Sequence, residues 1–378
     1  MDRWRPTRWV LLWVAATVIG TVVLSLLWIG GDNANSSLRT AAAEPSQPVE
    51  SDPASRVAAV WDSGTGPATA EPVEDATVVV GEDHGVRGLD PEDGSERWHY
   101  LRSTARLCDW TAADGVVVAV FRTEAGCDEA LALDAGTGRR QWYRSVNFSA
   151  EITLSSTNQL TVAATSTGVA VLGTTSNGLR WRYRPPADCR ISDSLPGDVG
   201  VAVALDCPSS AQLVLLDGFS GKERWTGELP AGAARILTAD GAVGVLALEL
   251  SGALEIFDRD GAPLVSLREE SIAIDDEAQP TAQLVGERLA VFTGSTLFAV
   301  NVQTDGIDWV VPAVTRPTLL GSGLLVFDGT DFVQHELATG AELRRIPVSG
   351  SAPPPGGRLD RIGSAIVVST PERVAVYR

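Results

Sequence analysis

Short apolar, β-branched runs recur along the chain from about residue 56 to its end. Clear examples are TVVVG (77–81), GVVVAVF (115–121), GVAVALD (200–206) and AIVVST (365–370). Each run is followed, after a few polar residues, by a second short apolar run that leads into a turn. This alternation is typical of β-strands, and no apolar stripe with a period of 3.6 residues accompanies it. The pattern therefore predicts an all-β body over residues 56–378.

The turns carry a repeated motif. Its clearest copies are GLDPEDGSERW (88–98), ALDAGTGRRQW (132–142) and LLDGFSGKERW (215–225). Two copies ending at Trp181 and Trp309 keep the Trp and shift the Gly by one place, and two degenerate copies end at Val265 and Arg344. The ends of the copies recur about every 41 residues, and four short antiparallel strands in such a repeat describe a propeller blade.

The repeated tryptophans predict packing between blades. A large flat side chain at the same position of each blade can pack against its neighbour and bury about 150–250 Å². The alternative is a platform for a sugar or a quinone, which would need only one such residue. We expect the packing role for Trp98, Trp142, Trp181, Trp225 and Trp309.

The seven copies predict at least seven blades. After Arg344 the chain offers further strands near residues 358–362, 365–370 and 373–378, and then ends without an outer strand. The segment Arg56–Trp61 precedes the first copy and has no hairpin partner of its own. We expect it to complete the C-terminal blade as its outer strand, because closing the ring removes an open edge. This gives eight four-stranded blades, with seven as the alternative.

The N-terminal region predicts a membrane anchor. Residues 9–29 carry no charge and are long enough, at about 1.5 Å per residue, to cross a hydrocarbon core. Arg3, Arg5 and Arg8 precede them, so residues 1–30 are predicted to be a cytoplasmic N-terminus and a transmembrane helix, with the rest outside the cytoplasm. A long signal peptide cleaved near residues 41–43 is the alternative. Residues 31–55 are rich in Pro, Ser, Ala and Glu, which predicts a disordered linker.

The four cysteines occupy equivalent places in two of the repeats. Cys108 and Cys189 follow a motif Trp, while Cys127 and Cys207 precede the next motif Asp. An exported chain permits disulfides, and we expect the pairs Cys108–Cys127 and Cys189–Cys207. Four buried thiols are the alternative.

The motif Leu-Asp-x-x-Thr-Gly-x-x-x-Trp, as at Leu133–Trp142, resembles the repeat of the quinoprotein-type (PQQ-like) β-propellers over residues 56–378. The resemblance is closest to membrane-anchored, exported actinobacterial PQQ-like propellers, which share an N-terminal anchor and cysteines placed in this way. The family includes quinoprotein alcohol dehydrogenases and non-catalytic propellers such as the lipoprotein of the outer-membrane protein assembly machine. The dehydrogenases use adjacent disulfide-bonded cysteines, a calcium ion and a catalytic Asp. Adjacent cysteines are missing from this sequence, and no position matches the calcium ligands or the catalytic base.

Charge and residue spacing narrow the possible chemistry. The net charge of −18 argues against a general nucleic-acid binder, which needs a basic face. His84, His99 and His335 do not have the spacing of metal ligands, and the acidic stretch at 269–277 lacks the spacing of a calcium loop. We therefore predict no catalytic, cofactor-binding or metal-binding residues, and no cofactor.

These observations favour a membrane-anchored, extracytoplasmic propeller that acts as a binding or scaffold module for a protein or cell-envelope partner. The alternative is a quinone- or sugar-dependent enzyme, or a ligand sensor, that uses the central channel. Charged groups converging on the ring axis above an aromatic floor would favour the alternative. The blades that lack a motif Trp, at 245–277 and 324–357, are where we expect the partner to bind.

Overall fold

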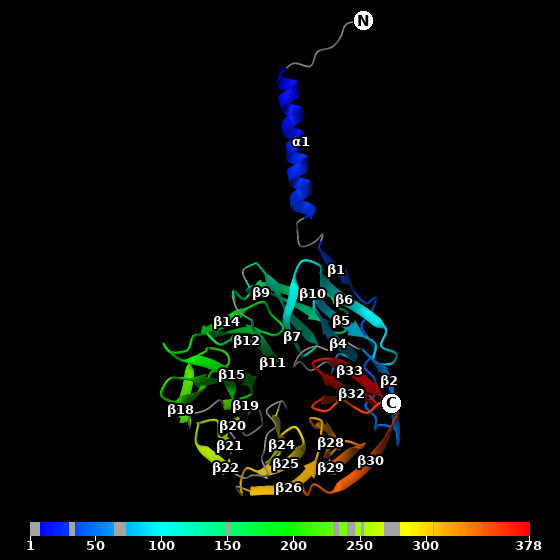
Figure 1. Cartoon of the computed structure of the whole chain (residues 1–378), viewed down its shortest axis with the longest axis vertical. Helices are drawn as coiled ribbons and strands as arrows, with labels where there is room; N and C mark the ends of the chain where they lie inside the picture. The colour runs from blue at the N-terminus through cyan, green and yellow to red at the C-terminus, as the bar shows by residue number, and fades with distance from the viewer. Residues whose placement is uncertain are drawn as a thin grey trace.

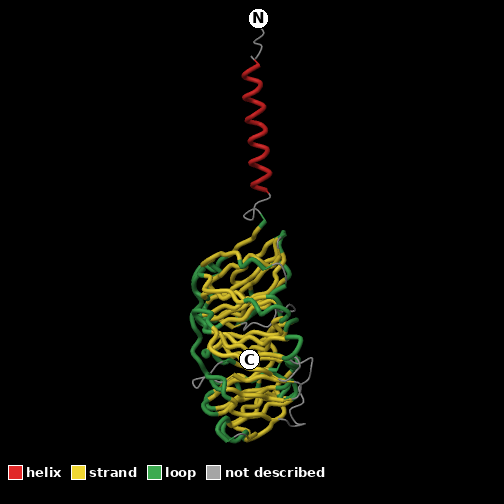
Figure 2. Tube along the Cα trace, turned by 90° about the vertical axis from the view of Figure 1, so that its left-hand side faces the viewer, coloured by secondary structure: helices red, strands yellow, loops and turns green. Residues whose placement is uncertain are grey.

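The computed structural model describes residues 8–29, 35–63, 73–124, 126–148, 151–229, 234–239, 246–250, 253–267, 280–304 and 306–378. One helix, α1 (Arg8–Ile29), precedes a succession of β-strands in these residues. The β-sheets follow one another around a ring, so that the first and last sheets lie side by side (Figure 1). Figure 2 shows the ring from the side, with α1 extending away from it.

Antiparallel sheets make up the first half of the ring, each with four strands that pair in chain order, and the first also has β1 (Ser36–Arg39) as a fifth strand beside β6. The first contains β3 (Val73–Glu74), β4 (Thr77–Glu82), β5 (Gly85–Leu89) and β6 (Glu96–Arg102). The second contains β7 (Arg106–Ala113), β8 (Val116–Thr123), β9 (Gly126–Asp134) and β10 (Arg140–Ser145). The third contains β11 (Thr153–Ser156), β12 (Leu160–Thr165), β13 (Gly168–Gly173) and β14 (Leu179–Tyr183). The fourth contains β15 (Arg190–Gly197), β16 (Gly200–Asp206), β17 (Ala211–Leu216) and β18 (Glu223–Leu229).

The second half of the ring repeats this arrangement. The strands β19 (Ala234–Thr238), β20 (Leu246–Leu250), β21 (Ala253–Phe257) and β22 (Pro263–Leu267) form one sheet. The next contains β23 (Thr281–Val285), β24 (Arg288–Phe292), β25 (Thr296–Asn301) and β26 (Gly306–Pro312). An eight-stranded sheet then joins β27 (Thr318–Leu320), β28 (Gly323–Phe327), β29 (Asp331–Glu336) and β30 (Glu342–Ser349) to β31 (Arg358–Ile362), β32 (Ala365–Thr370), β33 (Arg373–Tyr377) and β2 (Val57–Asp62).

The strand β2 closes the ring. It pairs antiparallel with β33, and two of its residues also pair in parallel with β30. Backbone hydrogen bonds run both ways between Ala58 and Arg378, at 2.8 and 3.0 Å. The expectation that Arg56–Trp61 becomes the outer strand of the C-terminal group is confirmed by this pairing. The strand β2, which precedes the first sheet in the chain, thereby covers the edge of β33 that the C-terminal hairpin would leave open.

The core lies between neighbouring sheets, which explains why the middle strands are continuously apolar. In β8, Val117, Ala119 and Phe121 pack in a buried cluster with the first sheet. Val118 and Val120, on the other side of β8, pack in a cluster with the third sheet. Because successive side chains of a strand point to opposite faces, a strand buried on both faces needs an apolar residue at each position.

The N-terminal segment, residues 35–55, differs from the predicted linker. The strand β1 (Ser36–Arg39) adds to the edge of β6, and Ala41 N donates to Thr137 O at 2.9 Å. Farther along, Arg361 donates to Ser51 O and Arg344 to Pro53 O, both at 2.6 Å. The prediction of disorder is wrong for this segment, because the ring supplies hydrogen-bond partners that its composition does not reveal.

The helix α1 covers the segment for which a membrane span is predicted. Within it, the structure describes the side chains of Trp9 and residues 12–22. Among the described residues, no helix has both the length and the apolar character needed to cross a membrane.

Two aspartates, the buried Asp109 and the half-buried Asp193, tie inner strands of neighbouring sheets together. Asp109 sits at a bulge of β7, where its carboxylate accepts hydrogen bonds from Trp110 N at 2.8 Å and from Leu154 N of the next sheet at 2.7 Å. Asp193 sits at the matching bulge of β15 and accepts from Ile236 N at 2.8 Å. Burial raises the pKa of Asp109 to about 6, although both backbone hydrogen bonds oppose the shift. Burial also raises the pKa of Asp193.

The raised pKa of Asp109 predicts a pH dependence of stability. In the unfolded chain this carboxyl ionises near pH 4, so between about pH 4 and 6 the folded state holds a proton that the unfolded state has lost. The contribution of Asp109 to the free energy of unfolding should thus fall by about 3 kcal/mol as the pH rises through this window. Because Asp109→Asn does not titrate, its stability relative to wild type should rise by that amount from pH 4 to pH 7 in urea denaturation. The exposed Asp188→Asn is the control, and an equal pH dependence in both variants would contradict the assignment.

Candidate functional site

The motif tryptophans lie between sheets. Trp98 is fully buried, and its indole Nε1 donates to Ala135 O in the next sheet at 2.8 Å. Its ring lies against Gly138, where a Cβ would be only 2.7 Å from the indole, and Gly138 has a φ of +70°. A side chain at this turn would therefore be strained and would collide with the indole. Hydrogen bonds of the same kind join Trp142 to Thr174 O, Trp181 to Gly218 O, Trp225 to Arg259 O and Trp309 to Leu337 O, at 2.9 to 3.1 Å.

One further tryptophan occupies the same position and was not identified from the sequence. Trp61, in the ring-closing strand β2, donates to Pro91 O at 3.2 Å and lies against Gly94 of the first sheet. The repeated motif does not include it, because β33, the strand with which β2 pairs, lies at the other end of the chain. In the degenerate copy that ends at Arg344, this arginine takes the place of the Trp. It donates a hydrogen bond to Pro53 O of the N-terminal segment.

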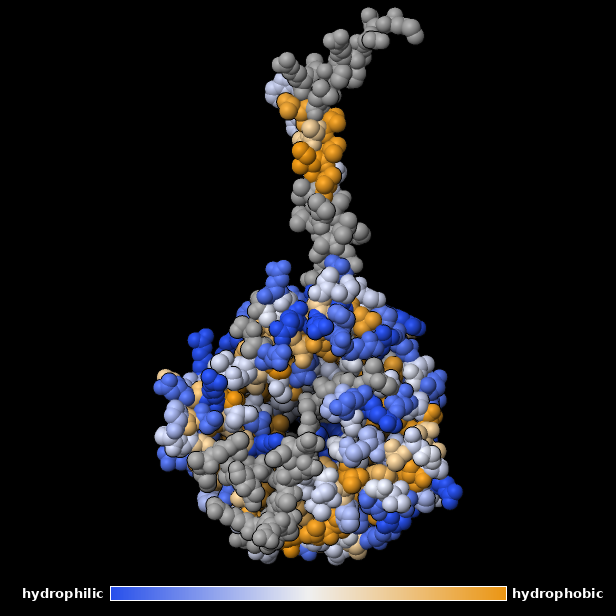
Figure 3. All heavy atoms as spheres, viewed as in Figure 1, coloured by the Kyte–Doolittle hydropathy of each residue, from blue (hydrophilic) through white to orange (hydrophobic). Residues whose placement is uncertain are grey.

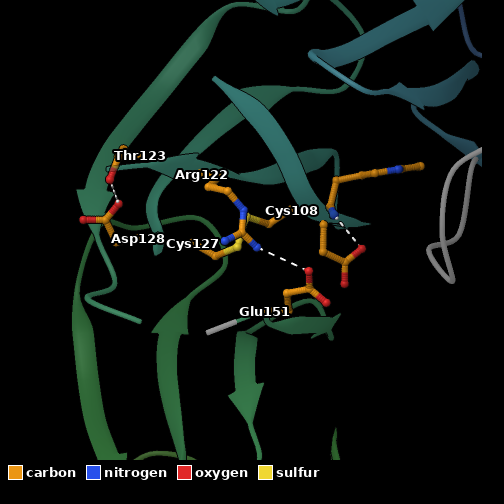
Figure 4. Close-up of a disulfide and its surroundings, with 8 residues drawn as sticks. Cys108, Arg122, Thr123, Cys127, Asp128 and Glu151 are labelled. Atoms are coloured by element: carbon orange, nitrogen blue, oxygen red, sulfur yellow. Dashed lines mark hydrogen bonds and ion pairs between the residues drawn. A yellow bond between two sulfur atoms is a disulfide. The ribbon is translucent and has the colours of Figure 1, made fainter. Parts of the chain in front are cut away.

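Both predicted disulfides, Cys108–Cys127 and Cys189–Cys207, are confirmed. The first joins β7 to β9 across β8 (Figure 4). Near it, Arg122 forms an ion pair with Glu151 at 3.4 Å and Thr123 donates to Asp128 at 2.6 Å. The two bridges belong to the second and fourth sheets, so they flank the third sheet.

A cavity of about 790 Å³ lies at the centre of the ring, where Figure 3 shows the surface hollowed. Inner strands of several sheets, with the turns beside them, contribute its walls. The charged side chains that line it are Glu74, Asp114, Asp198, Arg316, Arg358 and Asp360. None of the described lining residues is aromatic. A quinone-type site would combine charged groups with an aromatic floor. The described walls supply the charged groups and no aromatic side chain.

The two arginines of the cavity come from the two halves of the eight-stranded sheet and are held close together. Their backbones meet in a β-bridge, and Arg316 N donates to Gly357 O at 2.8 Å. The pKa of Arg316 is lowered to about 10, mainly by burial and secondarily by the nearby Arg358 guanidinium, while Asp360 opposes the shift. Arg358 Nε lies 3.5 Å from Asp360 Oδ1. At neutral pH Arg316 remains charged, so the cavity can bind an anionic group through this wall.

Of the carboxylates of the cavity, Asp114 and Asp198 lie in turns, whereas Glu74 ends β3 and Asp360 lies in β31. Glu74 Oε2 accepts a hydrogen bond from Gly115 N at 3.0 Å, which joins the first and second sheets. Asp114 precedes that glycine, and Asp198 occupies the corresponding turn of the fourth sheet. The cavity thus carries groups of both signs, which suits a ligand with both charged and hydrogen-bonding groups.

The other candidates from the sequence have local partners. His84 Nδ1 lies 2.8 Å from Ala105 O, His99 Nδ1 lies 2.7 Å from Glu96 Oε1, and His335 Nδ1 lies 2.9 Å from Gly340 O. In the part of the chain that the structure describes, no group of three or more His, Cys, Asp or Glu side chains could hold a metal ion. The acidic stretch at 269–277 lies outside the described residues.

The sequence matches no protein-family model and no curated protein. The ring nevertheless superposes on solved propeller structures. BamB from Moraxella catarrhalis has a TM-score of 0.50 and 16% identity, with 90% of this chain and 100% of that chain covered.

The fold is a β-propeller. The C-terminal WD40 domain of Sif2 has a TM-score of 0.56 at 11% identity, covering 87% of this chain and 98% of that one. The dihydro-heme d1 dehydrogenase NirN, in complex with DHE, has a TM-score of 0.55 at 14% identity, covering 83% and 78%. A europium-containing methanol dehydrogenase superposes at 0.52 and 11% identity, covering 83% and 84%. At such identities the likeness concerns the propeller fold, which serves unrelated functions.

Proposed function

We propose that this protein is an extracytoplasmic propeller held at the membrane, which acts by binding a protein or cell-envelope partner. The observation that carries the proposal is the central cavity, where Arg316 and Arg358 lie together in a wall formed by the two halves of the eight-stranded sheet. A charged segment of the partner would enter this cavity. Preorganised arginines favour a carboxylate or another planar or tetrahedral anion, because their donors are fixed in a fork.

The location rests on two further features. Two disulfides suit an oxidising compartment outside the cytoplasm. Residues 9–29 are uncharged and follow Arg3, Arg5 and Arg8, which favours an anchor with a cytoplasmic N-terminus. Only residues 30–34 separate α1 from the segment bound to the ring, so an anchor at α1 would hold the propeller within about 20 Å of the bilayer.

We also propose that the ring has eight blades. The eight-stranded sheet divides into two groups of four antiparallel strands, β27–β30 and β31–β33 with β2, which are joined by parallel pairing at only two residues. Counted with the other sheets, these groups supply eight units of blade type.

The second candidate function is a quinone- or sugar-dependent enzyme, or a sensor, with its ligand in the same cavity. The charged walls favour a small polar ligand as well as a protein segment. Two of the similar structures are dehydrogenases by name, and their fold alone carries over to this chain.

The test uses the full chain with a photo-crosslinking residue at Thr318 in the cavity wall, crosslinked in the membrane before purification in detergent. We expect crosslinking to a membrane-associated partner, weakened about tenfold or more in Arg358→Gln, because removing one member of a buried charged contact costs at least that much. Arg224→Gln, an ion-paired surface arginine outside the cavity, is the matched control. Equal crosslinking in all three chains would reject the binding proposal. Quinone-dependent oxidation of an alcohol or a sugar by the purified chain would instead support the second candidate.

A further inference from the structure

A second, smaller pocket lies away from the ring axis, at the junction of the second and third sheets. Its volume is about 150 Å³. The chain following β10, the turn between β12 and β13, and the end of β14 form its walls. The polar and aromatic side chains that line it are Asn147, Phe148, Thr165, Thr167, Arg182, Tyr183 and Arg184. None of these residues lines the central cavity.

Arg182 and Arg184 line this pocket and Arg144 lies near it, so the pocket carries positive charge. The pKa of Arg182 is lowered by burial first, and then by the nearby guanidinium groups of Arg144 and Arg184. Within the described ranges, the ion pairs that form do not include any of these three arginines. A carboxylate of the next sheet acts on the pocket's tyrosine: the pKa of Tyr183 is raised by burial and then by Glu223. A cluster of arginines is unusual in a chain with a net charge of −18.

The pocket is held in shape by the residues around it. Arg182 Nη2 donates to Val146 O at 2.6 Å, and its guanidinium carbon lies 5.7 Å from the centre of the Phe148 ring. Asn147 Oδ1 accepts from Ser145 Oγ at 2.7 Å, which orients the amide and leaves its Nδ2 as a donor. The turn between β12 and β13 is fixed to the next sheet by the hydrogen bond from Ile191 N to Ser166 O at 2.9 Å.

The disulfides strengthen this arrangement. Cys108–Cys127 lies in the second sheet, which forms one wall of the pocket, and Cys189–Cys207 lies in the fourth. Both neighbours of the third sheet are therefore crosslinked. A site whose supporting elements do not have to reorganise loses less free energy when it binds.

We propose that this pocket binds a phosphate group. Guanidinium groups recognise phosphate by paired, charge-assisted hydrogen bonds, and Arg182 and Arg184 supply two such groups at one wall. The hydroxyl of Thr167 and the amide of Asn147 line the other walls, so donors are available around a tetrahedral anion with several oxygens. The site is distinct from the central cavity and adds a second ligand class to the binding function proposed above.

The test measures inorganic phosphate binding by the full chain in detergent, using isothermal titration calorimetry. We expect saturable binding that is weakened about tenfold or more in the double variant Arg182→Gln/Arg184→Gln, because each charge-assisted hydrogen bond contributes a large part of the affinity. Arg180→Gln is the matched control. It lies in the same strand, is exposed, and stacks on Phe219 of the next sheet at 4.7 Å instead of lining the pocket. Thr167→Val, which removes only a hydroxyl, should weaken binding to a smaller extent.

Two further ligands test whether the phosphate belongs to a soluble compound or to a lipid headgroup. Glycerol 3-phosphate represents a soluble phosphomonoester, and glycerophosphoglycerol represents the phosphodiester of a lipid headgroup. Tighter binding of either one, with the same loss in the double variant, supports the proposal and identifies the source. An absence of saturable phosphate binding, or equal affinity in the double variant and in Arg180→Gln, would overturn it. Neither result bears on crosslinking at the central cavity, so this proposal and the proposed function fail independently.

Discussion

Replacing Trp98 with alanine is expected to lower the free energy of unfolding by about 3–5 kcal/mol, the range for truncating a large buried aromatic side chain. Trp98 has no exposed surface and fills the space between Gly88 of its own sheet and Gly138 of the next. The substitution would leave a cavity between two sheets and would also remove the hydrogen bond to Ala135 O. Because neighbouring sheets of a ring support one another, the loss should appear as a shift of the whole unfolding transition. Urea denaturation followed by far-ultraviolet circular dichroism measures it.

Two variants control this experiment. Trp98→Phe keeps most of the apolar contact and loses the indole N–H, so it should cost about 1–3 kcal/mol less than the alanine variant. Tyr143→Ala truncates an aromatic side chain that is 48% exposed on the outer strand β10, and it should change stability little. A loss for Trp98→Ala no larger than that for Tyr143→Ala would show that the indole is not a structural contact between sheets.

Introducing proline at Ala58 is expected to destabilise the protein by about 3 kcal/mol or more, because proline removes a backbone donor and cannot be accommodated inside a paired strand. Ala58 N donates to Arg378 O at 2.8 Å, and β2 is paired on both sides, with β33 and with β30. Loss of this strand would reopen the ring between its first and last sheets. Chemical denaturation gives the change in stability, and hydrogen exchange at the amides of β33 reports whether its edge is exposed.

Ala54→Pro provides the matched control. Ala54 lies four residues earlier, is exposed, and belongs to no strand, so a proline there should be tolerated. Equal stability and equal protection of β33 in the Ala58→Pro and Ala54→Pro chains would mean that β2 does not close the ring.

The central cavity could not be located from the sequence. Arg316 and Arg358 belong to no copy of the repeated motif, and each lies in the short connection before a four-stranded group or at its first strand. Their proximity follows from the radial arrangement of the sheets, which brings equivalent positions to one axis. The pocket at Arg182 and Arg184 was missed for a related reason. Its walls come from two neighbouring sheets, so neither stretch of sequence indicates a site by itself.

The N-terminal segment illustrates a different limit. Its low apolar content correctly indicated that it cannot form a core of its own. It is nevertheless ordered along the ring, because β6 offers an unpaired edge and Arg344 and Arg361 offer donors to its carbonyl groups. Composition describes what a segment can bury by itself, and it does not describe the partners that a distant part of the chain presents to it.

By itself, the sequence determined the features that depend on local pattern: the short strands, the repeated turn with its glycine and tryptophan, and the two disulfide pairs within single sheets. These follow from alternation, backbone conformation and short chain separation, all of which operate within one repeat. The tertiary structure decided how β2 and Trp61 close the ring, where the N-terminal segment binds, and which charged groups meet at the axis. Those features depend on contacts between residues as far apart as Ala58 and Arg378, whose pairing becomes favourable only when the intervening sheets have assembled in order around the ring.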